Sequence, residues 1–291
     1  MTAINSPIKL ITIPVSHYCE KVRWALNRAN IPFIEEPHMP PFHRVATRKF
    51  ATRSANSSVI QSERKMSFKN QLISRIVGGQ SVPVLITQLE ILTDSAQILY
   101  WVDSIADDNN KLYPINPADR QQVEDFVNQF DSLLAPAVRQ WFYAHTFNRP
   151  DLIKPLWCQG VPKIERMLFP VVFRWMRSNI SQTYTINSNT ILDVDAIISQ
   201  VFQTVETKLS DGRKYLVNDR FSAADLTFAT LAAAMVSPKG YGAIMPELDQ
   251  LPITMANRIR ELRETIAGKF VLRLYEEQNS RPKSGSEGIR I

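Results

Sequence analysis

The sequence SHYCEKVRWAL, from Ser16 to Leu26, decides the fold of the first part of this chain. It follows the short β-branched run IKLITI at 8–13, which predicts a strand. Within the quoted sequence apolar side chains recur at helical spacing, and Pro32 ends the pattern. These features predict a turn that leads from a strand into a helix over 16–30, with Ser16 at the helix N-terminus.

A second stretch, SVPVL at 81–85, predicts another strand, and a hairpin partner follows at 90–92. The sequence TDSAQ at 93–97 then predicts the start of a helix that runs to Ile105. With one more strand expected at 33–36, the first 105 residues have the order β-α-β, insertion, β-β-α. This is a thioredoxin-like order with one helix displaced or replaced.

Residues 49–77 interrupt this order with a polar, aperiodic sequence, which we interpret as an insertion that is mobile in part. Eight Lys or Arg side chains lie between Arg44 and Arg75, and Glu63 is the only acid among them. The net charge of the whole chain is +6, so the basicity is concentrated in this segment. That distribution argues against a nucleic-acid-binding domain built on a basic helix face. Contact of 44–75 with an anionic surface is a weaker possibility than a solvated loop.

The proline-punctuated sequence YPINP at 113–117 predicts a domain boundary. After it the strand signal nearly vanishes, and the helical patterns cover 118–146, 150–178, 191–210, 222–236 and 254–277. Ser222 and Asp225 have capping-box spacing at the start of a helix that is apolar nearly all round. We expect a thioredoxin-like α/β domain over 1–110, an all-helical domain over 117–277 and a flexible tail at 278–291.

The composition is that of a globular protein, with 44% hydrophobic and 21% charged residues among 291. No apolar run is long enough to span a membrane. Two cysteines, Cys19 and Cys158, are too few for a disulfide framework, which favours a reducing, cytoplasmic location.

Three motifs in order resemble those of the glutathione S-transferase superfamily. They are Ser16-x-x-Cys19-x-x-Val22-Arg23, then Val82-Pro83 before a hairpin and the Asp94-Ser95 helix start, and finally YLVNDRFSAAD at 215–225. The resemblance covers most of the chain but neither 49–77 nor the tail. It implies a thioredoxin-like domain followed by an all-α domain, glutathione as co-substrate, a small apolar electrophile as second substrate and a homodimer.

The resemblance also implies roles for individual residues. Val82, before a cis Pro83, would pair its backbone with the cysteinyl part of glutathione. Ser95 and the helix amides would hold a carboxylate, and Asp94 the γ-glutamyl ammonium. Ser16 would donate a hydrogen bond to the thiolate that attacks the electrophile.

Each of these residues also has a purely structural interpretation. Ser16 and the Asp94–Ser95 pair can be helix caps, and Pro83 can be a trans proline on an edge strand. Serine at the first position of the thioredoxin Cys-x-x-Cys pattern excludes a mixed disulfide there, so Cys19 is interpreted as inert.

Four further residues are candidates for the lining of the site: His17, Tyr18, His43 and Gln80. Tyr18 is the alternative to Ser16 as the hydroxyl that activates the sulfur. His38 and His43 have no third ligand nearby, so no metal is expected. The electrophile pocket would come from a minority of the aromatic residues Trp141, Phe142, Tyr143, Trp157, Phe173 and Trp175.

Two classes of function remain open from the sequence. The first is a glutathione transferase, whose electrophile and reaction type (conjugation, isomerisation or peroxide reduction) the sequence does not specify. The alternative is a non-catalytic, glutathione-transferase-like protein that binds a ligand or partner, with the insertion altering access to the site.

Overall fold

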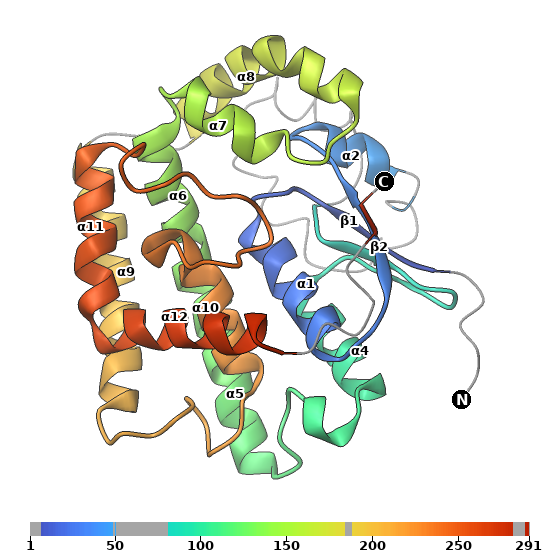
Figure 1. The fold of residues 1–291 in the computed structure, drawn as a ribbon, viewed down its shortest axis with the longest axis vertical. Coiled ribbons are helices and arrows are strands. Elements are labelled where there is room, and N and C mark those ends of the chain that lie inside the picture. The colour runs from blue at the N-terminus through green and yellow to red at the C-terminus, as the bar shows by residue number, and fades with distance from the viewer. Residues whose placement is uncertain (1–6, 49, 51–80, 184–187, 282–288, 291) are drawn as a thin grey trace.

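The structure is a computed structural model that describes residues 7–48, 50, 81–183, 188–281 and 289–290. The predicted insertion at 49–77 lies outside the described residues apart from Phe50, as does the candidate site residue Gln80. A small mixed sheet with its helices packs against a larger body of helices (Figure 1). The predicted fold, a thioredoxin-like domain plus a helical domain, is confirmed.

The sheet is built around β1 (Ile8–Thr12), whose residues are almost all buried. It has the order β4-β3-β1-β2-β5, where the other strands are β2 (Phe33–Pro37), β3 (Val84–Ile86), β4 (Ile91–Leu92) and β5 (Ile289–Arg290). β1 pairs parallel with β2 and antiparallel with β3, with Ile11 opposite Val84. This register brings the Ser16 turn and the segment before Val84 to the same end of the sheet.

Two helices of the first domain begin at residues near that end. α1 (His17–Arg28) follows β1 with Ser16 as its N-cap, and α4 (Ser95–Ile105) begins after the N-cap Asp94. A short helix not predicted from the sequence, α2 (Phe42–Thr47), follows Pro40 and Pro41. Both prolines precede the helix, so neither ring interrupts its hydrogen bonds.

The helical domain begins at α5 (Pro117–Gln129), which continues through a π-helical turn η5 (Phe130–Leu134) into α6 (Ala135–Thr146). Pro136 lacks the N–H that a regular α-helix would use at this point, which accounts for the local widening. The remaining helices are α7 (Pro150–Trp157), α8 (Lys163–Thr183), α9 (Ser188–Leu209), α10 (Ala223–Val236), α11 (Ile253–Glu264) and α12 (Ile266–Asn279).

Two predicted helices are each divided in the structure. The expected helix 150–178 breaks between α7 and α8, where Gly160 adopts φ +65° and Pro162 follows. The expected helix 254–277 breaks at Thr265, whose backbone is extended and whose side chain caps α12. Within the tail expected at 278–291, α12 continues to Asn279 and the backbone of 289–290 pairs with β2.

α10 forms the centre of the helical domain, and all but one of its residues are buried. The predicted capping box is confirmed, since Asp225 accepts hydrogen bonds from the Ser222 N–H at 2.7 Å and from its hydroxyl at 2.8 Å. α10 packs against α1, and Trp24 of α1 contacts Tyr275 of α12 with 4.5 Å between the ring centroids. The two domains therefore share one core, and the Ser16 turn lies at their junction.

Candidate functional site

Ser16 lines a cavity of about 250 Å³ between the two domains. Its backbone is extended, and its Oγ accepts a long hydrogen bond of 3.4 Å from the Cys19 N–H. The hydroxyl therefore caps α1, as the structural interpretation expected. Because that bond uses only a lone pair, the hydroxyl hydrogen is still available to a group in the cavity.

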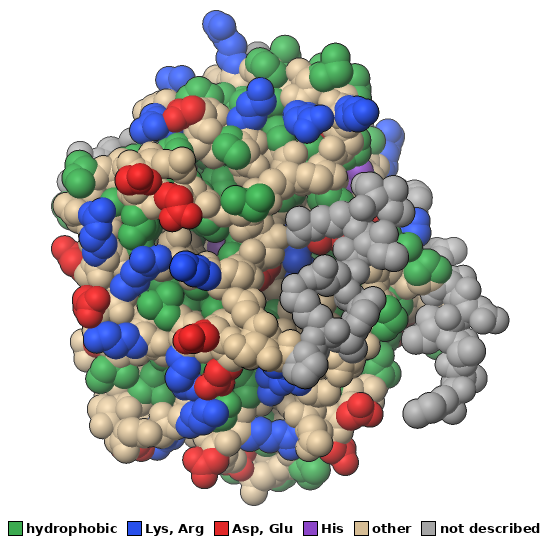
Figure 2. All heavy atoms as spheres, viewed as in Figure 1, with side chains coloured by type: hydrophobic (Ala, Val, Ile, Leu, Met, Phe, Trp, Pro, Cys, Tyr) green, Lys and Arg blue, Asp and Glu red, His purple; other side chains and the backbone are tan. Residues whose placement is uncertain are grey.

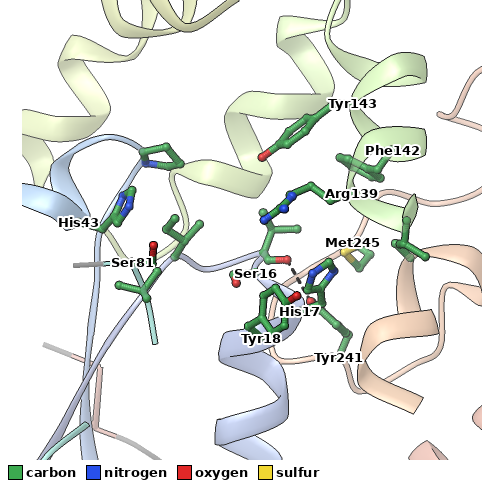
Figure 3. A pocket seen from close by; sticks show the side chains of 16 residues that line it. Ser16, His17, Tyr18, His43, Ser81, Arg139, Phe142, Tyr143, Tyr241 and Met245 are labelled. Atoms are coloured by element: carbon green, nitrogen blue, oxygen red, sulfur yellow. Dashed lines mark hydrogen bonds between the residues drawn. The ribbon is translucent and has the colours of Figure 1, made fainter. Parts of the chain in front are cut away.

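Both domains supply walls of this cavity (Figure 3). The first domain contributes the turn from Ile13 to Tyr18, together with Pro40, His43, Ser81 and Val82. The helical domain contributes Val138, Arg139, Phe142, Tyr143, Ala234, Tyr241 and Met245. The site thus has a polar side around Ser16 and an apolar, aromatic side along α6.

The two residues that follow Ser16, His17 and Tyr18, have side chains that are neutral at pH 7. Burial, with the nearby charges of Arg139 and Lys21, lowers the pKa of His17 to about 3. Burial and the Asp131 carboxylate raise the pKa of Tyr18 to about 12, and the Tyr18 hydroxyl donates to the Asp131 carbonyl at 3.1 Å. Since that bond uses its only hydrogen, Tyr18 is a poorer donor to a thiolate than Ser16.

The peptide bond between Val82 and Pro83 is cis, as expected. Val82 lines the cavity, just before β3 begins at Val84. The structure therefore brings Ser16 and Val82, which are 66 positions apart in the sequence, to one cavity.

Asp94 and Ser95 are not part of the cavity lining. The Asp94 carboxylate accepts hydrogen bonds from the amides of Ala96 at 2.9 Å and Gln97 at 3.1 Å, and Ser95 is buried. The Asp94 charge contributes, after burial and Asp131, to the raised pKa of Tyr18 in the first turn of α1. The predicted binding residues thus form one group at the cavity and a second group at the start of α4.

His43 lines the cavity, but its Nδ1 has no hydrogen-bond partner in the described part of the chain. Burial, followed by Arg44 and His38, lowers the pKa of its imidazole to about 3. His38 instead contacts Glu165 of α8, with 2.6 Å between Nδ1 and Oε1. Among the described residues no group of three or more His, Cys, Asp or Glu side chains is arranged to hold a metal ion.

Arg139 is the lining residue that the sequence analysis missed. It lies on α6, is exposed and points across the cavity toward Ser16 (Figure 3). Its guanidinium is the only Lys or Arg group in the described lining. A signal was present, because Arg139 precedes the predicted aromatic residues Phe142 and Tyr143 by three and four positions and so shares their helix face.

Of the aromatic residues considered for the electrophile pocket, Phe142 and Tyr143 line the cavity. Trp141, Trp157 and Phe173 are buried in the core, and Trp175 lies on α8 outside the lining. Cys19 is fully buried, and burial raises the pKa of its thiol to about 11, consistent with an inert residue.

Arg23, part of the first motif, holds the turn in place. Its guanidinium donates to the Pro14 carbonyl at 3.0 Å and to Glu35 at 2.8 Å. Glu20 accepts from Arg23 at 3.1 Å and from the Gly242 N–H at 3.0 Å. This buried network connects the loop before Ser16 to the sheet and to the helical domain.

A thioredoxin-like domain, a following helical domain and a cavity at their junction define the two-domain fold of this chain. Sequence models of two families match the chain: "Glutathione S-transferase, N-terminal domain" over residues 10–110 and "Glutathione S-transferase, C-terminal domain" over 168–258. The chain belongs to the glutathione S-transferase superfamily.

Two solved structures with TM-scores of at least 0.50 show the same fold at low sequence identity. The β-etherase LigF from Sphingobium sp. strain SYK-6 is 17% identical, with a TM-score of 0.51 over 92% of this chain and 100% of that one. Glutathione S-transferase III in its apo form is also 17% identical, with a TM-score of 0.50 over 96% and 94%. Glutathione transferase F2 from Populus trichocarpa is 16% identical, with a TM-score of 0.49 over 93% and 100%. A search of curated protein sequences found no significant match.

Proposed function

We propose that this protein is a glutathione transferase in which a glutathione thiolate, stabilised by Ser16, attacks a small apolar electrophile. The observation that carries the proposal is the convergence of the Ser16 hydroxyl, the segment at Val82 and the α6 face on one cavity. A peptide in extended conformation can pair with backbone groups next to a cis proline. A hydroxyl beside the sulfur favours the charged form of the thiol.

The size of the cavity suggests which parts of the reactants occupy it. At about 250 Å³ it is just below the usual range for ligand pockets, which begins at about 300 Å³. We infer that it holds the reacting ends, namely the cysteinyl thiol and the electrophile. The γ-glutamyl end would extend toward Asp94 and Ser95, outside the cavity. There the carboxylate meets the N-terminus of α4 and the ammonium meets the Asp94 side chain.

Arg139 adds a positive charge from the helical-domain wall of the cavity. A cation near the sulfur favours thiolate over thiol, in the same direction as the Ser16 hydrogen bond. The thiol proton passes to solvent, the thiolate sulfur forms a bond to the electrophilic carbon, and the leaving group departs with its bonding electrons. Phe142, Tyr143 and Met245 provide the apolar wall against which the electrophile packs.

Calorimetric titration with glutathione, followed by a conjugation assay with chlorodinitrobenzene, tests this function. We expect saturable binding and conjugation in the wild type, with kcat/KM about 100-fold lower in Ser16→Ala. Binding without conjugation of any electrophile tested would favour the non-catalytic alternative, and the absence of binding would refute a glutathione site. We also propose a homodimer, which light scattering tests independently.

A further inference from the structure

α8 exposes a row of apolar side chains on the side that faces away from the protein. Its buried side consists of Glu165, Phe169 and Phe173. On the outer side Ile164 is 61% exposed, Met167 75% and Val171 71%, and Leu168 between them is 39% exposed. These residues recur at three- and four-residue spacing, so they form one continuous stripe along the helix. Large aliphatic side chains in such a row are typical of an interaction site.

The stripe is bordered by positive charge. Four exposed basic residues lie on α8, and the only acid between Lys163 and Thr183 is the buried Glu165. The basic residues are Lys163, Arg166, Arg174 and Arg177. In Figure 2 hydrophobic and basic side chains gather at the upper end of the molecule, where Figure 1 places α7 and α8.

A groove beside the stripe contributes further basic groups. It has a volume of about 550 Å³ between α7 and α8, and Lys154, Arg174 and Arg177 line it next to Phe169 and Pro170. Asp151, the one acid in its lining, is paired with Arg149 at 2.6 Å. The groove therefore offers cationic groups from two helices to an anion at the same surface.

The charge on this face argues against a second copy of the chain as its occupant. In a symmetric dimer the same patch lies on both subunits, so four basic residues would face four others. Like charges brought together at an interface are unfavourable. An anionic bilayer instead offers acyl chains to the aliphatic stripe and phosphate groups to the arginines around it.

We propose that α8 binds the protein to the surface of an anionic phospholipid bilayer. The stripe of Ile164, Met167, Leu168 and Val171 enters the headgroup region, while Arg174 and Arg177 contact lipid phosphates. None of the helices in the described ranges is long and apolar enough to cross a membrane. Because Glu165, Phe169 and Phe173 keep one side of α8 packed against the protein, only its outer side would contact the bilayer. On the opposite side of α8, Glu165 accepts from the Met39 N–H at 2.8 Å, one residue before Pro40 of the cavity lining. The bound helix would thus adjoin the loop that borders the active-site cavity.

Co-sedimentation with vesicles tests this inference and involves no glutathione, so its result is independent of the proposed transferase function. Vesicles of phosphatidylcholine alone are compared with vesicles that also contain phosphatidylglycerol. We expect binding to the anionic vesicles to be at least about tenfold tighter and to weaken with added salt. Both Met167→Glu/Val171→Glu and Arg174→Gln/Arg177→Gln should bind at least about tenfold more weakly.

A matched control places the same charges at apolar residues that are exposed elsewhere. Leu89 is 97% exposed and Ile115 99%, so Leu89→Glu/Ile115→Glu should bind anionic vesicles as the wild type does. Thermal unfolding of each variant verifies that the fold is retained. A fluorophore attached through Met167→Cys should report an apolar environment on vesicle binding, whereas one attached through Ile115→Cys should not.

Three results would overturn the inference. The first is a wild type that does not pellet with anionic vesicles at low salt. The second is binding that is as tight for Met167→Glu/Val171→Glu as for the wild type. The third is a dimer, seen by light scattering, that dissociates in Met167→Glu/Val171→Glu, which would assign the stripe to contact between copies of the chain.

Discussion

Arg23 on α1 and Glu35 on β2 form a buried ion pair, with 2.8 Å between Nε and Oε1. Burial alone would lower the pKa of Arg23, but Glu35 and Glu20 beside it hold that pKa above its ordinary value. The same guanidinium donates to the Pro14 carbonyl, two residues before Ser16. The ion pair therefore fixes the turn that presents the proposed catalytic hydroxyl.

Arg23→Met should destabilise the protein by about 3–5 kcal/mol, because it leaves two carboxylates buried without their cation. Urea unfolding followed by circular dichroism measures the free energy of unfolding. Arg149→Met, which removes a solvent-exposed ion pair with Asp151, is the control and should leave the midpoint unchanged within error. Equal midpoints for both variants would show that the Arg23 network does not stabilise the turn.

Glu165→Ala should loosen the loop that carries Pro40 and His43. It leaves the buried Met39 N–H without an acceptor, at a cost of about 1–3 kcal/mol, and also removes the partner of His38. We expect the KM for glutathione to rise, since His43 and Pro40 line the cavity. Glu165→Gln, which retains one acceptor oxygen, should have the smaller effect. Kinetics that are the same for Ala and Gln would contradict this role.

Stability should fall as the pH drops below about 6.5, in part because of His17. Burial, Arg139 and Lys21 lower its pKa in the folded protein to about 3, so between about 3 and 6.5 the unfolded state binds the additional proton. The contribution of His17 to the free energy of unfolding is present above about pH 6.5 and is lost as the pH falls. At pH 5.5 this loss of stability reaches about 1.4 kcal/mol. Urea unfolding of wild type and His17→Gln near pH 7 and pH 5.5 should therefore give a smaller pH effect for the variant. Equal pH effects would show that the pKa of His17 is not lowered in the folded protein.

The sequence patterns located the cavity lining better beside the strands of the first domain than along its helical wall. Ser16 follows β1 and Val82 precedes β3, where strand register restricts the geometry. Arg139 could not be placed in the same way, because its position depends on how α6 packs across the domain junction. That packing depends in turn on the π-helical turn at 130–134, which no simple periodicity predicts.

The structure differs from the sequence-based predictions at two other places. The break between α7 and α8 requires the positive φ of Gly160, and a pattern of apolar residues does not report backbone conformation. Asp94 and Ser95 do not line the cavity, and the spacing of residues along the sequence does not report such distances in three dimensions. The motif predicts a helix N-terminus but not which wall of the site it forms.

Arg139→Gln should impair conjugation mainly at low pH. If the guanidinium favours the thiolate, its loss lowers kcat/KM about tenfold near pH 6.5, and the loss shrinks near pH 9, where the thiol ionises without assistance. Arg139→Lys keeps the charge and should retain most of the activity. A pH–rate profile of each variant measures this. A reduction that is the same at every pH would instead indicate that Arg139 positions the electrophile.

The central claim is that the Ser16 hydroxyl stabilises the thiolate of bound glutathione. The most direct test is a pH titration of the ultraviolet thiolate absorbance of glutathione bound to wild type, to Ser16→Ala and to Ser16→Thr, each saturated as judged by calorimetry. The account predicts that the wild type and Ser16→Thr hold the thiolate at about pH 7, whereas Ser16→Ala needs a more alkaline pH to form it. Superimposable titration curves for wild type and Ser16→Ala would contradict the account.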